Sequence, residues 1–97
     1  MIEIIKSPEF TKWLHGLKDG HAKIVINKRL LRLKIGHLGD VKPVGDGISE
    51  VRIHYGPGYR LYCIRKGKAV IVMLGGGNKS SQSRDIKRAK QLADYWR

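Results

Sequence analysis

The 97-residue chain carries 20 Lys and Arg residues against 8 Asp and Glu, a formal net charge of +12, and 41% of its residues are hydrophobic. The length fits one domain over residues 1–97, and the hydrophobic content excludes a disordered chain. The charge predicts an anionic partner, which is nucleic acid, an acidic protein or an anionic membrane.

The first elements are a strand and a helix. Met1–Lys6 is predicted to be a short strand with three isoleucines. Ser7, Pro8 and Glu9 are typical of a helix start, as N-cap, first helical residue and first-turn acid. One apolar stripe at i, i+3, i+4 and i+7 follows, formed by Phe10, Trp13, Leu14 and Leu17.

A second helix is predicted over His21–Ile35, after a break at Asp19-Gly20. Its apolar face holds Ala22, Ile26, Leu30 and Leu33, widened by Ile24, Leu31 and Ile35. The two helices should form a hairpin packed on a sheet. The segment Gly36–Gly47, rich in glycine, is expected to be a loop without regular structure.

Three consecutive strands are predicted next, at Ile48–Tyr55, Tyr59–Arg65 and Ala69–Leu74. The first two alternate apolar and polar residues, as two-faced strands do. The third is apolar on both faces and should be central and covered on both sides. The run Gly75–Asn78 should end it, and a last helix should follow, capped by Ser80 or Ser81, with its apolar face formed by Ile86, Ala89, Ala93 and Trp96. The expected fold is α+β (β-α-α-β-β-β-α) with an antiparallel sheet, an N-terminal helical hairpin and a C-terminal helix.

One face of this strand meander collects cations and proton-transfer groups, and Lys79 follows just past the third strand; the face residues are Arg52, His54, Arg60 and Tyr62. Two arginines on neighbouring strands repel each other unless an anion lies between them. The alternative is a solvated sheet face. Glu50 shares the parity of Arg52, which predicts a simple ion pair.

Other motifs give weaker signals. The glycines before Lys79 lack phosphate-loop spacing, so either their N–H groups bind an anion or they only form a turn. The four histidines are scattered, and we expect no metal and no cofactor. On the last helix, Lys87 and Arg88 form a basic flank expected to contact substrate.

Several runs together resemble the RelE/ParE toxin superfamily, and more narrowly its HigB-like "addiction module killer protein" branch. The resemblance lies in Gly47–Ile53, Gly56–Tyr62, Leu74–Gln82 and Asp85-Ile86 with Ala89, and it covers nearly the whole chain. Asn78 departs from the aspartate expected at its position, and the last helix is unusually basic.

The resemblance implies a toxin of a type II toxin–antitoxin pair, a metal-independent endoribonuclease that cuts mRNA in the ribosomal A site. There the 2′-OH attacks the adjacent phosphate, which requires a proton acceptor, a proton donor and cations. Arg52 and Arg60 would hold the phosphate, and Lys79 would be a further cation or the base. Tyr62 or His54 would donate or relay a proton, and Tyr62 could instead stack on a base.

Two other functions stay open. One is a ParE-like protein that poisons DNA gyrase by binding alone, and the other is a non-toxic basic module that binds nucleic acid. If the protein is the ribonuclease toxin, its expected partners are mRNA on the ribosome and an antitoxin of the helix-turn-helix kind. The toxin and antitoxin are expected to form an oligomeric complex, and no membrane partner is expected. Met1–Ile5 lacks a basic leader and the single cysteine, Cys63, can form no internal disulfide, which favours a cytoplasmic protein with Cys63 as a small buried hydrophobe.

Overall fold

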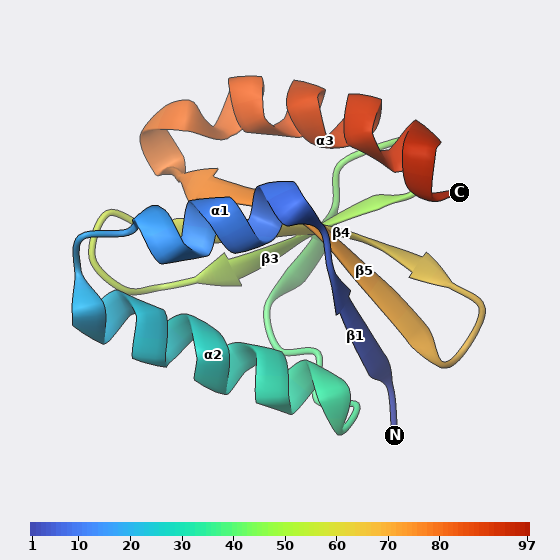
Figure 1. Cartoon of the computed structure of the whole chain (residues 1–97), viewed down its shortest axis with the longest axis horizontal. Helices are drawn as coiled ribbons and strands as arrows, with labels where there is room; N and C mark the ends of the chain where they lie inside the picture. The colour runs from blue at the N-terminus through green and yellow to red at the C-terminus, as the bar shows by residue number, and fades with distance from the viewer.

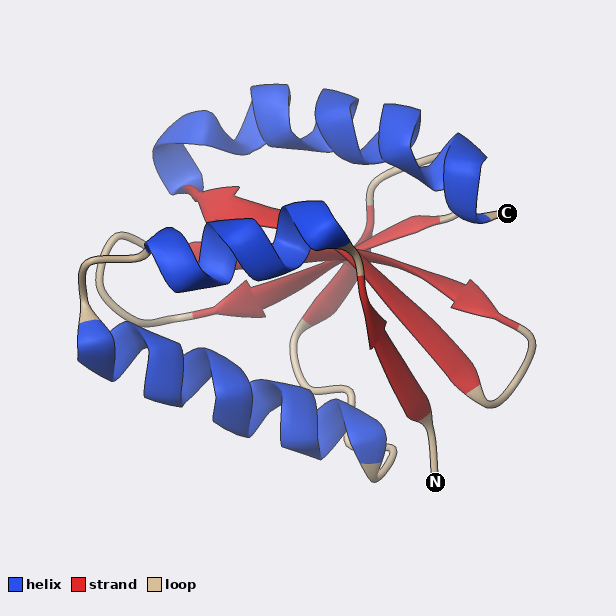
Figure 2. Cartoon of the chain, in the orientation of Figure 1, coloured by secondary structure: helices blue, strands red, loops and turns tan.

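A five-stranded sheet with strand order β1-β5-β4-β3-β2 lies between helices on its two faces (Figures 1 and 2). The computed structural model describes all residues, 1–97. None of its helices has the length and apolar character needed to cross a membrane. The elements are β1 (Glu3–Lys6), α1 (Pro8–Gly16), α2 (Gly20–Lys34), β2 (Val41–Pro43), β3 (Ile48–Ile53), β4 (Tyr59–Lys66), β5 (Val70–Asn78), a 3-10 turn at Lys79–Ser81, and α3 (Gln82–Trp96).

The sheet is mixed, so the expectation of an antiparallel sheet is wrong for one strand. The strands from β2 to β5 pair antiparallel, whereas β1 pairs parallel with β5, with Glu3 opposite Val70 and Lys6 opposite Met73. Tight turns force successive strands to run antiparallel, but the helical hairpin that follows β1 imposes no such constraint. At the end of β1, Ser7 donates its backbone N–H to Met73 and its hydroxyl to Leu74.

A second correction concerns the segment between α2 and β3, expected to be a loop. It contains β2, which pairs antiparallel with β3 from Val41 opposite Val51 to Pro43 opposite Ser49. The strand is three residues long and at the edge, where a proline is tolerated because its missing N–H faces away from the partner. The element order therefore has one strand more than expected.

Each helix of the hairpin begins directly after a residue whose side chain caps its first turn. The hydroxyl of Ser7 accepts the N–H of Phe10, and Pro8 begins α1 as predicted. The carboxylate of Asp19 accepts the N–H groups of His21 and Ala22 at the start of α2. These contacts satisfy backbone donors that have no partner inside the helix.

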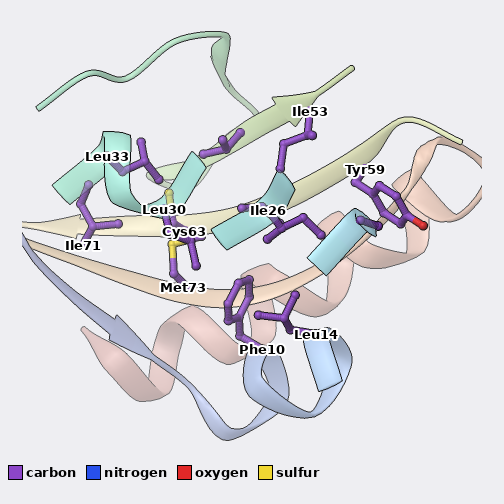
Figure 3. Packing of buried hydrophobic residues seen from close by; sticks show 13 residues of the cluster. Phe10, Leu14, Ile26, Leu30, Leu33, Ile53, Tyr59, Cys63, Ile71 and Met73 are labelled. Atoms are coloured by element: carbon purple, nitrogen blue, oxygen red, sulfur yellow. The ribbon is translucent and has the colours of Figure 1, made fainter. Parts of the chain in front are cut away.

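The helical hairpin packs on one face of the sheet (Figure 3). The predicted face of α2 is confirmed, since its four members are buried against strand residues such as Val51, Leu61 and Met73. The predicted widening is wrong, because the residues Ile24, Leu31 and Ile35 lie exposed on the outer side of α2. Cys63 is buried in this core, and burial raises the pKa of its thiol to about 12.

The other face of the sheet is covered by α3. Ala89 and Ala93 are buried against Ile48, Tyr62, Ile64, Val72 and Leu74, and Ile86 and Trp96 pack at the margin. β5 contributes Ile71 and Met73 to the first core and Val72 and Leu74 to this one. The prediction of a central strand covered on both sides is thus confirmed.

The glycine run does not end β5 as expected. Gly75, Gly76 and Gly77 continue the strand to Asn78, and none has a positive φ. A Cβ at Gly76 would overlap the ring of Trp13 from α1, and one at Gly77 would overlap the carboxylate of Asp85 from α3. Gly76 and Gly77 allow α1 and α3 to pack closely on the two faces of β5. Neither a turn nor an anion-binding loop explains them.

Asn78 caps the 3-10 turn that leads into α3, and the expected serine, Ser81, stands at the N-cap position of α3. The amide oxygen of Asn78 accepts the N–H of Ser80, and the hydroxyl of Ser81 accepts the N–H of Asn78. Ser81 is the N-cap of α3 itself but makes no side-chain cap hydrogen bond there. The N–H of Ser80 is therefore already bound to Asn78 and is not free for an external anion.

Candidate functional site

A hollow of about 430 Å³ lies at the end of the sheet where β3 turns into β4. It brings together four of the five residues predicted to be catalytic: Arg52, His54, Arg60 and Lys79. The rest of its wall is the connecting turn and its flanks, formed by Ile53, Tyr55, Gly56, Pro57, Gly58 and Tyr59.

The two arginines come together because of strand register. Arg52 on β3 is the direct partner of Arg60 on β4, so both side chains leave the same face of the sheet. An anion lies between them, as their repulsion requires, and the chain supplies it. The Nε of Arg52 is 3.1 Å from one carboxylate oxygen of Glu50, and the Nε of Arg60 is 3.8 Å from the other.

Glu50 is the centre of this site, although it does not line the hollow. Its side chain is fully buried, and it accepts hydrogen bonds from the hydroxyl of Tyr62 at 3.2 Å and the amide of Gln82 at 2.8 Å. A buried carboxylate is tolerated only when it is well paired and hydrogen-bonded. Glu50 thus ties β3, β4 and the first residue of α3 together beneath the two arginines, and its predicted ion pair with Arg52 is present.

Arg60 retains unused hydrogen-bonding capacity. Its side chain is 12% exposed, and one terminal nitrogen donates to the carbonyl of Gly58 at 2.9 Å. Its Nε is buried and makes no hydrogen bond. One carboxylate therefore faces two guanidinium groups, which leaves an excess of positive charge at the hollow.

Tyr62 does not lie on an open face, and this is a correction. The ring is fully buried under α3, so it cannot stack on a base in this conformation. Burial first, and then the neighbouring Glu50 carboxylate, raises the pKa of its phenol well above the usual value. Tyr62 shares the face of Arg60, as strand parity predicts, but α3 covers that face at Tyr62 and leaves it without access to a ligand.

His54 is also placed differently from the prediction. β3 ends at Ile53, so His54 belongs to the turn and not to the strand face of Arg52. Its side chain is 77% exposed, and its Nε2 is 2.6 Å from a carboxylate oxygen of Asp40. The hydrogen bond from His54 holds the pKa of Asp40 below its usual range.

Lys79 is the exposed first residue of the 3-10 turn after β5, and it forms no ion pair. Gly58, with φ +79, lies next to it, since a Cβ on Gly58 would come within 3.7 Å of the Cβ of Lys79 and 3.4 Å of a terminal nitrogen of Arg60. Glycine suits this turn because the left-handed backbone disfavours other residues. Gly58 thus lies beside both Arg60 and Lys79 at the edge of the hollow.

Lys87 and Arg88 are not brought to this hollow. Both are exposed on α3, and Lys87 borders a separate shallow hollow with Asp46, Lys90, Gln91, Asp94 and Arg97. No group of three or more His, Cys, Asp or Glu side chains converges anywhere in the chain as a metal site would need.

Sequence reasoning missed two polar partners of the site, Asp40 and Gln82. Asp40 lies just before β2 and meets His54 only because β2 pairs with β3. Gln82, the first residue of α3, reaches Glu50 on the face of the sheet that α3 covers. Neither contact has a local sequence signal, since they span 14 and 32 residues.

Comparison with known proteins finds a close relative in sequence and similarity to solved structures. Over 92 residues the chain is 47% identical to an uncharacterized protein of Haemophilus influenzae, which covers 95% of this chain and 93% of that protein. The solution structure of the conserved hypothetical protein HP0894 from Helicobacter pylori matches with a TM-score of 0.53 and 22% identity, over 82% of this chain and 97% of that one. No protein-family model matches the chain. The second likeness shows a common fold alone, whereas the first shows that the chain belongs to the family of the Haemophilus influenzae protein.

Proposed function

We propose that the protein is the toxin of a type II toxin–antitoxin pair, of the RelE/ParE superfamily and its HigB-like branch, and acts as a ribosome-dependent mRNA endoribonuclease. The observation that carries the proposal is the convergence of three cations, Arg52, Arg60 and Lys79, on one hollow. Attack of a 2′-OH on the adjacent phosphorus places extra negative charge on the phosphate oxygens. Cations fixed where that charge develops stabilise the transition state.

The two proton transfers require side chains that an RNA strand in the hollow can reach. The attacking 2′-OH must lose a proton, and the leaving 5′ oxygen must gain one. Tyr62 is buried and donates to Glu50, so it is poorly placed for either transfer. His54 lines the hollow and contacts Asp40, a carboxylate that can orient its imidazole. We therefore favour His54 for one transfer and keep Lys79 as a cation or as the second proton-transfer group.

The antitoxin belongs to the same proposal. With a net charge of +12, the natural inhibitor is an acidic protein segment that covers the hollow and neutralises its cations. The association rate of such a partner with the protein would be higher at low ionic strength. The bound partner would compete with RNA for the same side chains.

The test is cleavage of mRNA on programmed ribosomes by the wild type and by Arg60→Lys. Lysine keeps a positive charge near Glu50, but it lacks the planar fork that a guanidinium offers to phosphate. Loss of such a donor costs on the order of 10²–10³ in rate. Arg65→Lys is the matched control, because Arg65 is an exposed arginine toward the other end of the same strand.

Normal cleavage by a folded Arg60→Lys variant would refute the assignment of the hollow as the active site. If the wild type leaves mRNA intact on ribosomes and stops DNA synthesis in cells, the gyrase-poison alternative replaces the nuclease. Thermal melts of each variant separate loss of function from loss of fold.

A further inference from the structure

A second hollow, of about 230 Å³, adjoins the first across the turn after β3. The two share three wall residues, Ile53, His54 and Tyr55, and are therefore neighbours on either side of this turn. The far wall of the second hollow is the side of α2, contributed by Val25, Lys28, Arg29 and Arg32. A basic surface thus extends from the arginine pair, over the turn, to α2.

Lys28 and Arg32 on this wall have no counter-ion. Both are exposed, and neither lies within ion-pair distance of a carboxylate. They are four residues apart on α2, so their side chains are neighbours on one helix face and repel each other. An external anion between them would relieve that repulsion.

Arg29 fixes this wall relative to the first hollow. One of its terminal nitrogens donates to the backbone carbonyl of Arg52 at 2.7 Å, and the other donates to the carbonyls of Leu38 and Asp40 at 3.0 and 3.1 Å. These hydrogen bonds hold α2 against the end of β3. The spacing between the arginine pair and the two free cations is therefore set by the fold.

The turn between the hollows is also held in place. The hydroxyl of Tyr55 donates to the carboxylate of Asp19 at 3.3 Å, and its ring lies 5.2 Å from that of His21. Tyr55, which is half-buried, and His54, which is exposed, lie between two cationic hollows. Aromatic and basic side chains in this arrangement resemble the surfaces on which single-stranded nucleic acids bind.

We infer that the second hollow is a phosphate subsite, in which Lys28 and Arg32 bind a phosphate of the RNA strand whose scissile phosphate lies at Arg52 and Arg60. This inference rests on the proposed function for the identity of the strand. It adds the path of that strand, which crosses the turn at His54 and Tyr55 and continues along α2. The binding is electrostatic and independent of base identity.

The experiment measures binding of fluorescently labelled 2′-O-methyl oligonucleotides, in which the nucleophile is blocked, over a range of salt concentrations. The probes are a dinucleotide, with one internucleotide phosphate, and a hexanucleotide. The variant is Lys28→Gln/Arg32→Gln. The control is Lys66→Gln/Lys68→Gln, which removes the same charge from the exposed end of β4 and the turn that follows it.

The hexanucleotide should bind more weakly to the α2 variant than to the control, and the slope of log affinity against log salt should fall by about 0.7 for each phosphate that the variant no longer binds. The dinucleotide should bind equally to both. Equal weakening in the two double variants would overturn the inference, because net charge alone would then explain the binding. Equal weakening of both probes in the α2 variant would overturn it as well. A protein that binds as expected but leaves mRNA uncut on ribosomes would refute the nuclease and leave the subsite standing.

Discussion

Glu50 is a single carboxylate that pairs with two arginines and also accepts hydrogen bonds from Tyr62 and Gln82. Its burial means that no water can replace these partners. The residue therefore has two opposite effects on an anion in the hollow. It orients the guanidinium groups, and it also reduces the positive potential that they present.

Glu50→Gln should lower the stability of the protein and strengthen its response to phosphate. Removing one partner of a buried ion pair leaves uncompensated charge, which costs about 3 kcal/mol. Two arginines without their counter-ion should then bind inorganic phosphate more tightly, and a ligand that binds only the folded state raises its melting temperature. Thermal melts with and without phosphate measure both effects.

Glu3→Gln is the control for this prediction. Glu3 is an exposed carboxylate on β1, so its replacement should change stability by no more than about 0.5 kcal/mol. The account of Glu50 fails if Glu50→Gln melts like the wild type, or if added phosphate raises the melting temperatures of both variants equally.

The arginine pair could be predicted from sequence because strand parity and a short turn fix which residues share a face and stand opposite. These two rules are sufficient to place Arg52 opposite Arg60. The places of Tyr62 and His54 could not be read in this way. Tyr62 is buried by α3, an element that begins 20 residues later, and His54 leaves the strand face because β3 ends one residue before it.

At the scale of elements, α1 comes closest to the backbone of β5 at Gly76, where the indole of Trp13 occupies the space that a Cβ would need. Gly76→Ala should destabilise the protein by about 1–3 kcal/mol, because the new methyl group would overlap the indole. Gly75→Ala is the matched control, since a Cβ at Gly75 meets no atom within 4 Å and its φ is not positive. Chemical denaturation of the two variants measures the difference.

A double-mutant cycle tests whether overlap with the Trp13 indole causes the destabilisation expected of Gly76→Ala. Trp13→Ala alone should cost about 3 kcal/mol, and in that background Gly76→Ala should cost little because the overlap has gone. If the cost of Gly76→Ala is the same with and without the indole, the glycine is required for another reason and the packing explanation is wrong.

Most helices and strands were predictable because their signals are local. The Ser7 cap and the apolar stripes of α1, α2 and α3 lie within single elements. The direction of β1 and the existence of β2 were not predictable. Both depend on pairing with distant strands, β5 and β3, and a three-residue strand has no periodicity of its own.

At the scale of the whole molecule, the net charge of +12 is confined to a body of 33 × 29 × 23 Å. The screening length is about 30 Å at 0.01 M salt and about 8 Å at 0.15 M. At the lower concentration every cation therefore repels cations across the whole protein, and at the higher one it repels only its neighbours. Self-repulsion of this kind destabilises the compact state.

The melting temperature of the free protein should therefore rise as sodium chloride increases from about 0.01 to about 0.15 M. If screening contributes about 1 kcal/mol, the shift is about 4–8 °C for a domain of this size. The double variant Lys66→Glu/Lys68→Glu, with fewer positive charges in an exposed turn, should show a smaller shift. A melting temperature that stays constant or falls over this range would mean that the folded state does not carry the repulsion that its charge implies. Repeating the series with sodium sulfate at equal ionic strength tests for bound anions, because an anion held at the arginine pair or between Lys28 and Arg32 should add stability beyond the chloride curve.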